Sequence, residues 1–270
     1  MISPINNSEL IAFPIGSIAL ERFGLKFSAG GTHISRTMML AELGSVLAAV
    51  PVGASSADYK SAILQLNVLC KTTDSTRKKS LRHLRELYAL DENVPIFRLL
   101  RTLQAFDIGA SLPLLALQVA WSRDPLFRST TQPVLYASVG EKVDREGLVQ
   151  ALAATFPDQY SEASVRTATQ NAASSWTQSG HLVGHVIKIR RQVKPTPVAV
   201  TMALFLGQVA GSHGAAVFSS PWVRLLDLDA DRARALAQEA HRLGLLNLRS
   251  VGEVFELSFP LLAGLQGITE

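Results

Sequence analysis

The sequence contains a single cysteine, Cys70, among 270 residues. One thiol cannot form an internal disulfide, and it cannot supply the several sulfur ligands of a structural zinc or iron–sulfur centre. Cys70 stands in the apolar segment ILQLNVLCK, where we expect a small buried core residue rather than a reactive thiol. The cysteine count therefore excludes disulfide scaffolds and multi-cysteine metal centres.

The sequence also lacks an uninterrupted apolar run of the roughly 20 residues that a membrane-spanning helix needs. Pro113 interrupts the run IGASLPLLALQVAWS, and the N-terminal MISPINNSELIAFPIGS has neither the basic start nor the apolar centre of a signal peptide. Hydrophobic residues nevertheless make up 47% of the chain and charged residues only 18%, which is typical of a globular protein. We expect a cytoplasmic protein with no membrane partner.

Catalytic and nucleotide-binding motifs are missing as well. The sequence has no P-loop, no paired-glycine dinucleotide fingerprint, no HExxH and no GxSxG. The segment SAGGTH could hold a phosphate, but such a glycine pair is more often an ordinary turn. His181 and His185 are four residues apart, yet no nearby acid or thiol completes a metal site. We therefore expect no enzyme activity, no cofactor and no bound metal.

Acidic residues are absent from one long stretch, although the net charge is only +4. No Asp or Glu occurs from Ala163 to Leu226. Within that stretch the basic segment VIKIRRQVK is followed at once by Pro195 and Pro197, which favours a domain boundary. If the segment is a strand, Lys188, Arg190 and Gln192 share one face, opposite Ile187, Ile189 and Arg191.

Helical periodicity dominates the chain before this boundary. The expected elements are a possible strand in IGSIAL, a helix beginning after Thr32 or Ser35 and closed by Pro51, helices over 56–70, 75–90, 94–106 and 110–122, a shorter helix in the 130s, and two helices capped by Asp144 and Ser161 that end near Phe156 and Gln178. Trp176 is expected on the buried face of the last of these, which Gly180 ends.

A different pattern follows Pro195. It consists of a helix from Pro197, a short strand in AAVFS, a short helix in SPWVRLLDL, a helix between Asp229 and Gly244, and two strands around Val251–Gly252. This is the order of a winged helix-turn-helix. We predict a mainly α fold, in which a helical bundle with a helix-turn-helix-like element (1–190) precedes a C-terminal winged-helix-like domain with a small β-hairpin (195–270).

A second concentration of cations lies in the helix expected over 75–90. At 100° per residue, Leu81, Leu84, Leu87 and Tyr88 form one apolar face, and the cations lie opposite. The preceding helix and polar turn resemble a helix-turn-helix, whose second helix enters DNA N-terminus first. The predicted DNA-binding residues are Arg77, Lys78, Lys79, Arg82 and Arg85, with Lys188, Arg190, Arg191 and Lys194 as a second contact surface. The polar face has no Asn or Gln, which favours phosphate contacts over base reading; a solvated basic face without a ligand is the alternative.

The stretch ILQLNVLCKTTDSTRKKSLRHLRELYAL resembles the BrxA-type small proteins of bacterial BREX anti-phage defence islands. The matching positions are Asn67, Leu69, Lys71, Ser75, Thr76, Arg77, Arg82, Arg85, Leu87 and Leu90. The resemblance covers about residues 63–90, and the first thirty residues and the segment SSWTQSGHL have no counterpart in it. It implies a non-enzymatic accessory protein that binds double-stranded DNA and works with other proteins of the same defence system.

Two other functions remain open. From Thr196 to Pro260 the C-terminal segment has five Arg against six acids, so it is not basic enough to bind DNA chiefly by itself. It could instead dock on a larger defence enzyme as a protein-interaction scaffold. The winged order also allows a transcriptional regulator with a preferred operator.

Overall fold

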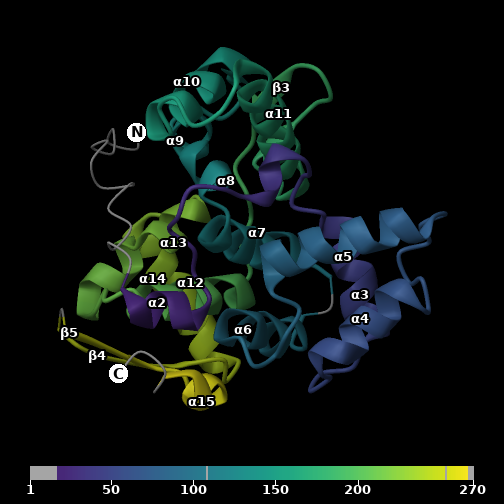
Figure 1. Ribbon diagram of the computed structural model, residues 1–270. Helices are drawn as coiled ribbons and strands as arrows, with labels where there is room; N and C mark the ends of the chain where they lie inside the picture. Colours follow the sequence, from purple (N-terminus) through teal and green to yellow (C-terminus); the bar gives the residue numbers. More distant parts are fainter. Residues whose placement is uncertain (1–16, 108, 253, 267–270) are drawn as a thin grey trace.

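The computed structural model describes residues 17–107, 109–252 and 254–266, and these parts of the chain are mainly helical (Figure 1). The helices are α2 (Ile18–Phe23), α3 (Leu40–Ala49), α4 (Ser56–Leu64), α5 (Asp74–Tyr88), α6 (Pro95–Gln104), α7 (Leu112–Arg123), α8 (Pro125–Ser129), α9 (Thr131–Leu135), α10 (Arg145–Thr155), α11 (Glu162–Gln178), α12 (Pro197–Val209), α13 (Pro221–Leu225), α14 (Ala230–Arg242) and α15 (Ala263–Gln266). In the described residues they are joined by the 3-10 helices η1 (Thr32–Ile34), η2 (Gly214–Ser219) and η3 (Pro260–Leu262).

Two small antiparallel sheets complete the described fold. In the first, β3 (Lys188–Arg190) pairs on one side with β1 (Lys142–Val143) and on the other with β2 (Leu182–Val183). The second is the hairpin of β4 (Asn247–Val251) and β5 (Val254–Ser258). The predicted C-terminal hairpin is therefore present.

Helix α12 lies at the centre of the fold and is buried on all sides from Val198 to Gly207. It packs against α6 and α7, which precede the predicted boundary, and against α13 and α14, which follow it. Trp121 of α7 meets Trp222 of α13 edge to face at 5.8 Å. The hydrophobic core is thus continuous across the segment between residues 190 and 195.

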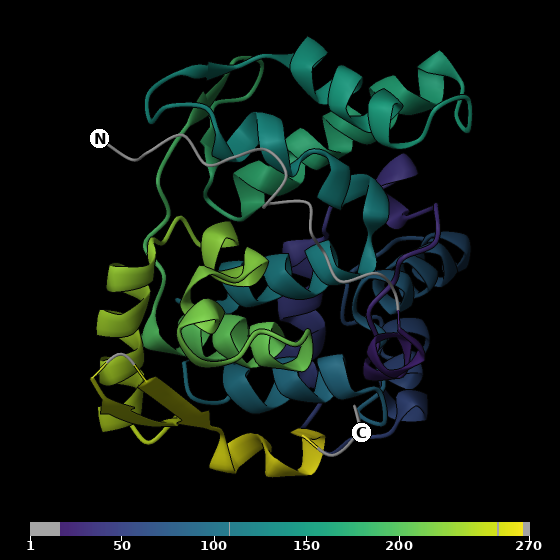
Figure 2. The ribbon, with the colours of Figure 1, turned by 90° about the vertical axis from the view of Figure 1, so that its left-hand side faces the viewer.

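A smaller group of elements, α8 to α11 with the sheet β1–β3–β2, sits above this core in Figures 1 and 2. It has its own small apolar cluster, in which Leu126, Leu152, Val165 and Ala168 are buried. Trp176 is also fully buried and donates from Nε1 to the Thr130 hydroxyl at 2.9 Å. The expected role of Trp176 as an inward-facing anchor is confirmed.

Helix boundaries follow their capping residues closely. Ser161 and Asp229 accept backbone N–H groups at the starts of α11 and α14, as their positions predict. Asp144 occupies the N-cap of α10 without a side-chain cap bond. Gly180 and Gly244 follow the ends of α11 and α14 with φ of 90° and 73°, in the left-handed region that favours glycine.

Two predicted strands are wrong. The described part of the segment IGSIAL, from Ser17 on, leads into α2 instead, because Ser17 caps the helix by accepting from the Leu20 N–H, and the helix buries Leu20 and Phe23; the first two residues of the segment lie outside the described residues. The segment AAVFS forms the 3-10 helix η2, which buries Val217 and Phe218 before Pro221 starts α13. In both segments a short apolar run fits a buried helical turn as well as a strand, so its pattern does not separate the two.

Two predicted helix boundaries are also wrong. The helix expected after Thr32 or Ser35 begins only at Leu40, because residues 32–34 form η1. The helix expected over 56–70 ends at Leu64, and Cys70 adopts φ of 50° in the following turn. Cys70 is exposed there rather than buried in the core.

Candidate nucleic-acid interface

Helix α5 carries the cations that the sequence singles out. Thr73 starts the helix by accepting from the Thr76 N–H. Leu81, Leu84, Leu87 and Tyr88 are buried, as the helical pattern predicts. Figure 1 shows α5 at the edge of the molecule, beside α3 and α4, with one long side uncovered. Its cationic side chains therefore project from a fixed helix.

The five predicted cations of α5 differ in exposure. Lys78, Lys79 and Arg82 are exposed, whereas Arg77 and Arg85 are half-buried. Lys78 pairs with Asp74 at 2.7 Å across one helical turn, and Arg85 donates to the Ser56 hydroxyl at 3.2 Å. Lys79 and Arg82 are consequently the α5 cations best placed for an outside anion.

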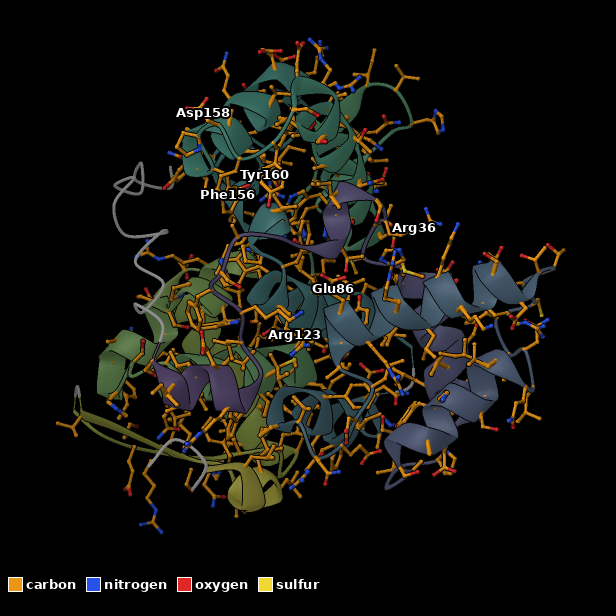
Figure 3. All side chains as sticks on the ribbon, viewed as in Figure 1. Arg36, Glu86, Arg123, Phe156, Asp158 and Tyr160 are labelled. Carbon is orange, nitrogen blue, oxygen red and sulfur yellow. The ribbon has the colours of Figure 1, made fainter. Side chains whose placement is uncertain are left out.

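Arg36 extends this cationic surface, and sequence reasoning missed it. Arg36 is exposed beside α5 (Figure 3). His83 connects the two segments: burial lowers its pKa, and the charges of Arg82 and Arg36 lower it further, while Glu86 opposes them. Both cations therefore lie near the same imidazole, and Figure 3 shows Arg36 beside α5. We call Arg36, Lys79 and Arg82 the α5 cationic surface.

The turn before α5 explains several residues of the sequence stretch that resembles BrxA-type proteins. The Asn67 side chain donates to the Lys71 carbonyl at 3.1 Å and accepts from the Lys71 N–H at 2.9 Å. Lys71 itself pairs with Glu42 at 3.0 Å. Asn67 and Lys71 therefore fix the approach to α5, so this part of the motif has a structural role. Residues 65–73 separate α4 from α5, which is longer than the roughly 3–4 residues of a helix-turn-helix connection.

The second predicted surface lies on β3 and the arm after it. Arg191 and Lys194 are exposed, and Lys188 is half-buried. The Lys188 ammonium donates to Thr177 Oγ1 at 3.0 Å and to the Gly184 carbonyl at 2.8 Å. Lys188 thus supports the β2–β3 turn in addition to carrying charge.

The prediction that Arg190 contacts DNA is wrong. Its side chain is 4% exposed and is ion-paired with Asp227. Asp227 also accepts the Val193 N–H at 3.0 Å, so the pair ties β3 to the segment after α13. Asp227 is the first acid after the acid-free stretch, and only the folded chain brings it to Arg190.

Hydrogen bonds connect the two cationic regions through α11. Lys188 bonds to Thr177 near the end of α11, and the neighbouring Gln178 accepts the Leu40 N–H at 3.0 Å. Leu40 begins α3, only four residues after Arg36. The β2–β3 turn and the α5 cationic surface are therefore fixed to the same helix end.

A buried Asp–His–Ser chain links three distant segments. His33 Nδ1 lies 2.8 Å from Asp124 Oδ2, and Nε2 lies 2.8 Å from Ser175 Oγ. Burial opposes the charge of Asp124, but His33 and backbone N–H groups lower the pKa of that carboxyl overall. Ser175 is fully buried and also bonds to Met38 and Asn171. The groups of a hydrolase triad are thus present, but Ser175 has no room for a substrate, so the chain is a structural clamp.

The same contacts of Asp124 explain why the segment SAGGTH has a glycine at position 31. The His33 N–H donates to Asp124 Oδ2 at 3.1 Å. A Cβ at Gly31 would lie 2.1 Å from Asp124 Oδ1. The turn therefore packs against the Asp124 carboxylate, which occupies the place beside the His33 N–H where a phosphate would have to bind.

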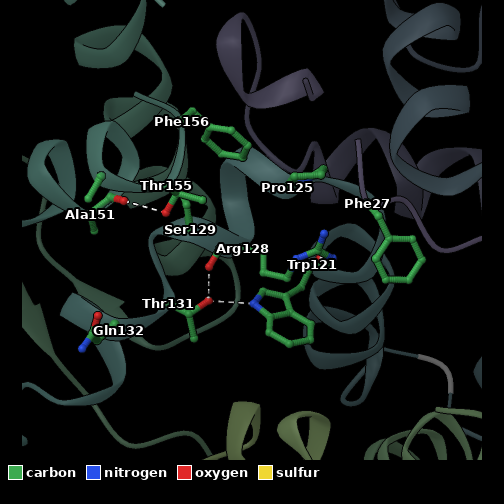
Figure 4. Close-up of a pocket in the computed structure, with 11 residues that line it drawn as sticks. Phe27, Trp121, Pro125, Arg128, Ser129, Thr131, Gln132, Ala151, Thr155 and Phe156 are labelled. Carbon is green, nitrogen blue, oxygen red and sulfur yellow. Dashed lines mark hydrogen bonds between the residues drawn. The ribbon is translucent and has the colours of Figure 1, made fainter. Parts of the chain in front are cut away.

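A groove of about 410 Å³ opens between α7, α8, α9 and α10 (Figure 4). Trp121 donates to the Thr131 hydroxyl at 2.7 Å, and the Arg128 guanidinium donates to the Lys26 carbonyl at 2.7 Å. Burial lowers the pKa of Arg128 to about 10. The lining residues are Phe27, Trp121, Pro125, Arg128, Ser129, Thr131, Gln132, Ala151, Ala154, Thr155 and Phe156. None of them is an acid, a histidine or a cysteine, so the groove itself supplies neither a general base nor a metal-ligand set.

His181 and His185 do not converge. His181 is fully buried, with Nε2 2.9 Å from the Leu225 carbonyl, whereas His185 is exposed in the β2–β3 turn. In the described part of the chain, no group of three His, Cys, Asp or Glu residues is arranged to hold a metal ion. None of its helices has the length and apolar character needed to cross a membrane.

No protein-family model matches the chain, and no curated protein matches it.

Proposed function

We propose that this protein binds double-stranded DNA mainly through phosphates, as a non-enzymatic accessory of a BREX-like phage-defence system. The observation that carries the proposal is the α5 cationic surface, in which the exposed Lys79 and Arg82 project from one supported helix and the exposed Arg36 of a second segment lies beside that helix. Phosphate contacts need clustered charge and no particular base edge. The defence role rests on the resemblance of residues 63–90 to BrxA-type proteins.

Helix α5 would approach the backbone from its N-terminal half. The first turn of a helix carries the positive end of the helix dipole, which attracts phosphate, although here Thr73 already accepts the Thr76 N–H. Asp74 lies in that turn and pairs with Lys78, so it offsets part of the attraction. The stronger contribution is therefore expected one and two turns later, at Lys79 and Arg82. The long connection between α4 and α5 favours this backbone contact over deep insertion in a groove.

The C-terminal segment supports a winged-helix-like assignment. Helix α12, η2, α13, α14 and the β4–β5 hairpin follow in that order, and β5 packs against η2 at the place where a winged helix has its first strand. On α14 the exposed Arg232, Gln238 and Arg242 alternate with Asp231 and Glu239. This mixed charge favours a supporting contact or a protein partner over a second strong phosphate site.

The proposal is tested by fluorescence anisotropy with a 30-base-pair duplex at 50–200 mM salt. The affinity of the unmodified protein is expected to fall steeply with salt, because binding releases condensed counterions. The Lys79→Ala/Arg82→Ala variant should bind more weakly, and the magnitude of its log–log salt slope should be smaller by about 2, one phosphate contact per cation.

Arg22→Ala is the matched control, because Arg22 is exposed on α2, away from α5 in Figure 1. Binding that does not depend on salt, or an equal loss in both variants, would contradict the assignment to α5. A strongly preferred sequence in a selection from random DNA would instead favour the transcriptional-regulator alternative.

A further inference from the structure

The turn between β2 and β3 presents aliphatic side chains to solvent. Val186 is 87% exposed and Ile187 58% exposed, and Val183 at the base of the turn is 40% exposed. Single apolar residues on a surface are ordinary, but these two are adjacent and stand together at the end of a hairpin. We call Val186 and Ile187 the hairpin tip.

The hairpin tip is held firmly. Gly184 has φ of 100°, and a Cβ at this position would lie 2.1 Å from the Ile187 carbonyl oxygen. The Lys188 ammonium closes the turn from the other side by donating to the Gly184 carbonyl and to Thr177. Strand β3 is paired on both edges. The two aliphatic side chains are therefore presented by a pre-organised turn, which reduces the entropy lost on binding.

The residues that follow the hairpin tip, in β3 and in the arm after it, include several cations. Lys188, Arg191 and Lys194 follow it, and the acid-free stretch of the sequence includes the whole hairpin. On the adjacent strand, Val143 pairs with Lys188, so Asp144 and Arg145 come next, on the side of the tip. Their charges are opposite, as are those of the exposed Glu141 and Lys142 before them. This neighbouring strand therefore leaves the charges of Lys188, Arg191 and Lys194 in excess, whereas Arg190 is neutralised by Asp227.

We infer that the hairpin tip inserts from the minor groove between two base pairs of the DNA, while the flanking cations contact the phosphates beside it. Several DNA-binding proteins insert apolar side chains in this way and unstack one base step. An apolar wedge with a cationic flank fits a duplex, because the base faces are apolar and the edge of the groove is anionic. The inference rests on the proposed DNA binding and adds a mode of contact that the α5 cationic surface does not supply.

The test uses the full chain and a duplex that contains 2-aminopurine at successive positions. Insertion unstacks the probe, so its fluorescence is expected to rise on binding of the unmodified protein. The Val186→Ser/Ile187→Ser variant should lose this rise and bind roughly tenfold more weakly, because two aliphatic side chains no longer leave water. Its salt slope should stay unchanged, since no cation is removed. Both substituted residues are exposed, so the fold is retained, and circular dichroism checks this.

Ile18→Ser is the matched control, because Ile18 is 72% exposed on α2, away from the hairpin. It should bind and unstack DNA like the unmodified protein. A duplex with one mismatched pair should bind more tightly than a fully paired one, because its base step is already weakened. The tip variant should lose this preference.

The failures of the two proposals are distinguishable. If the unmodified protein binds DNA with a steep salt dependence but the 2-aminopurine signal stays flat and the tip variant binds equally well, the wedge is wrong and the phosphate-binding function stands. The wedge is also overturned if the tip variant keeps DNA affinity but loses a co-purifying protein, which would place the tip in a partner's pocket. Absence of any DNA binding overturns both.

Discussion

The imidazole of His33 and the carboxylate of Asp124 are 2.8 Å apart in a fully buried site, although 91 residues separate them in the chain. The contact joins the 3-10 helix η1 to the start of α8, where Asp124 also caps the helix by accepting the Phe127 N–H at 3.0 Å. His33 is stacked on Phe127 at 4.4 Å as well. One carboxylate thus fixes a turn, an imidazole and a helix start.

Gly31→Ala is expected to break this arrangement. Its Cβ would meet the Asp124 carboxylate at 2.1 Å, so the free energy of unfolding should fall by about 2–3 kcal/mol. Gly30→Ala is the matched control: Gly30 also has a positive φ, of 127°, but a Cβ there has nothing within 4 Å. It should cost only about 1 kcal/mol of backbone strain. Urea unfolding of both variants measures the difference, and equal losses would contradict the proposed clash.

Arg190 and Arg191 are adjacent but should behave oppositely. Arg190→Ala leaves Asp227 without its buried partner, so stability should fall by about 3 kcal/mol. Arg191→Ala removes an exposed side chain and should change stability by less than about 0.5 kcal/mol. It should instead weaken DNA binding and reduce the salt slope by about 1. Denaturant titration and anisotropy on the same two variants check both expectations. A loss of DNA binding without a loss of stability in Arg190→Ala, or the opposite result in Arg191→Ala, would contradict these roles.

His181 should make stability depend on pH. Burial is the main cause that lowers its pKa; Asp227 and the Leu225 carbonyl oppose the shift, Arg190 adds to it, and the resulting pKa is about 4. The unfolded chain takes up the proton near pH 6.5, and the folded protein does so only near pH 4. The contribution of His181 to the free energy of unfolding is therefore fully present above about pH 6.5. It is lost progressively as the pH falls toward 4, by about 1.4 kcal/mol per pH unit within that window.

The measurement compares the unmodified protein with His181→Gln by urea unfolding at pH 7.5 and 5.5. The unmodified protein should lose about 1.4 kcal/mol more than the variant over this interval. Other titrating groups contribute equally to both proteins and cancel in the comparison. The same pH dependence in both would contradict the role of His181.

Arg36 should be detectable through His83 without any DNA. Because the Arg36 charge lowers the pKa of His83, Arg36→Ala should raise that pKa, and Arg82→Ala should raise it as well. An NMR titration of the imidazole resonances measures both shifts. Arg22→Ala should leave the resonance of His83 unchanged. If only Arg82→Ala moves the pKa, Arg36 does not belong to the α5 cationic surface.

The regular helices could be predicted because their apolar residues repeat with the helical period. Helix α5 shows this best, since Leu81, Leu84 and Leu87 fix both its existence and its buried face. The caps Ser161 and Asp229 could be predicted for a local reason, because an N-cap acts within its own first turn.

The candidate site was less predictable, because contacts between residues far apart in the chain decide which cationic side chains are buried and which are exposed. Arg190, Arg101, Arg123 and Arg191 look alike in sequence, yet only Arg191 is exposed. Arg101, for example, is buried and donates to the Leu47 and Val50 carbonyls at the end of α3. A buried arginine of this kind donates its hydrogen bonds to groups inside the protein, so its charge does not face a ligand in solvent. Arg36 was missed for the opposite reason, since it belongs to an irregular segment that only folding brings beside α5.

The continuous burial of α12 has a consequence for synthesis of the chain on the ribosome. Helices α6 and α7 leave an apolar surface open until α12 covers it, and α12 starts at Pro197. The first 190 residues are therefore expected to remain incompletely packed while they emerge, and to reach a stable core only after Val209 has left the exit tunnel. A chain truncated after Lys194 should accordingly bind chaperones and resist purification as a folded monomer.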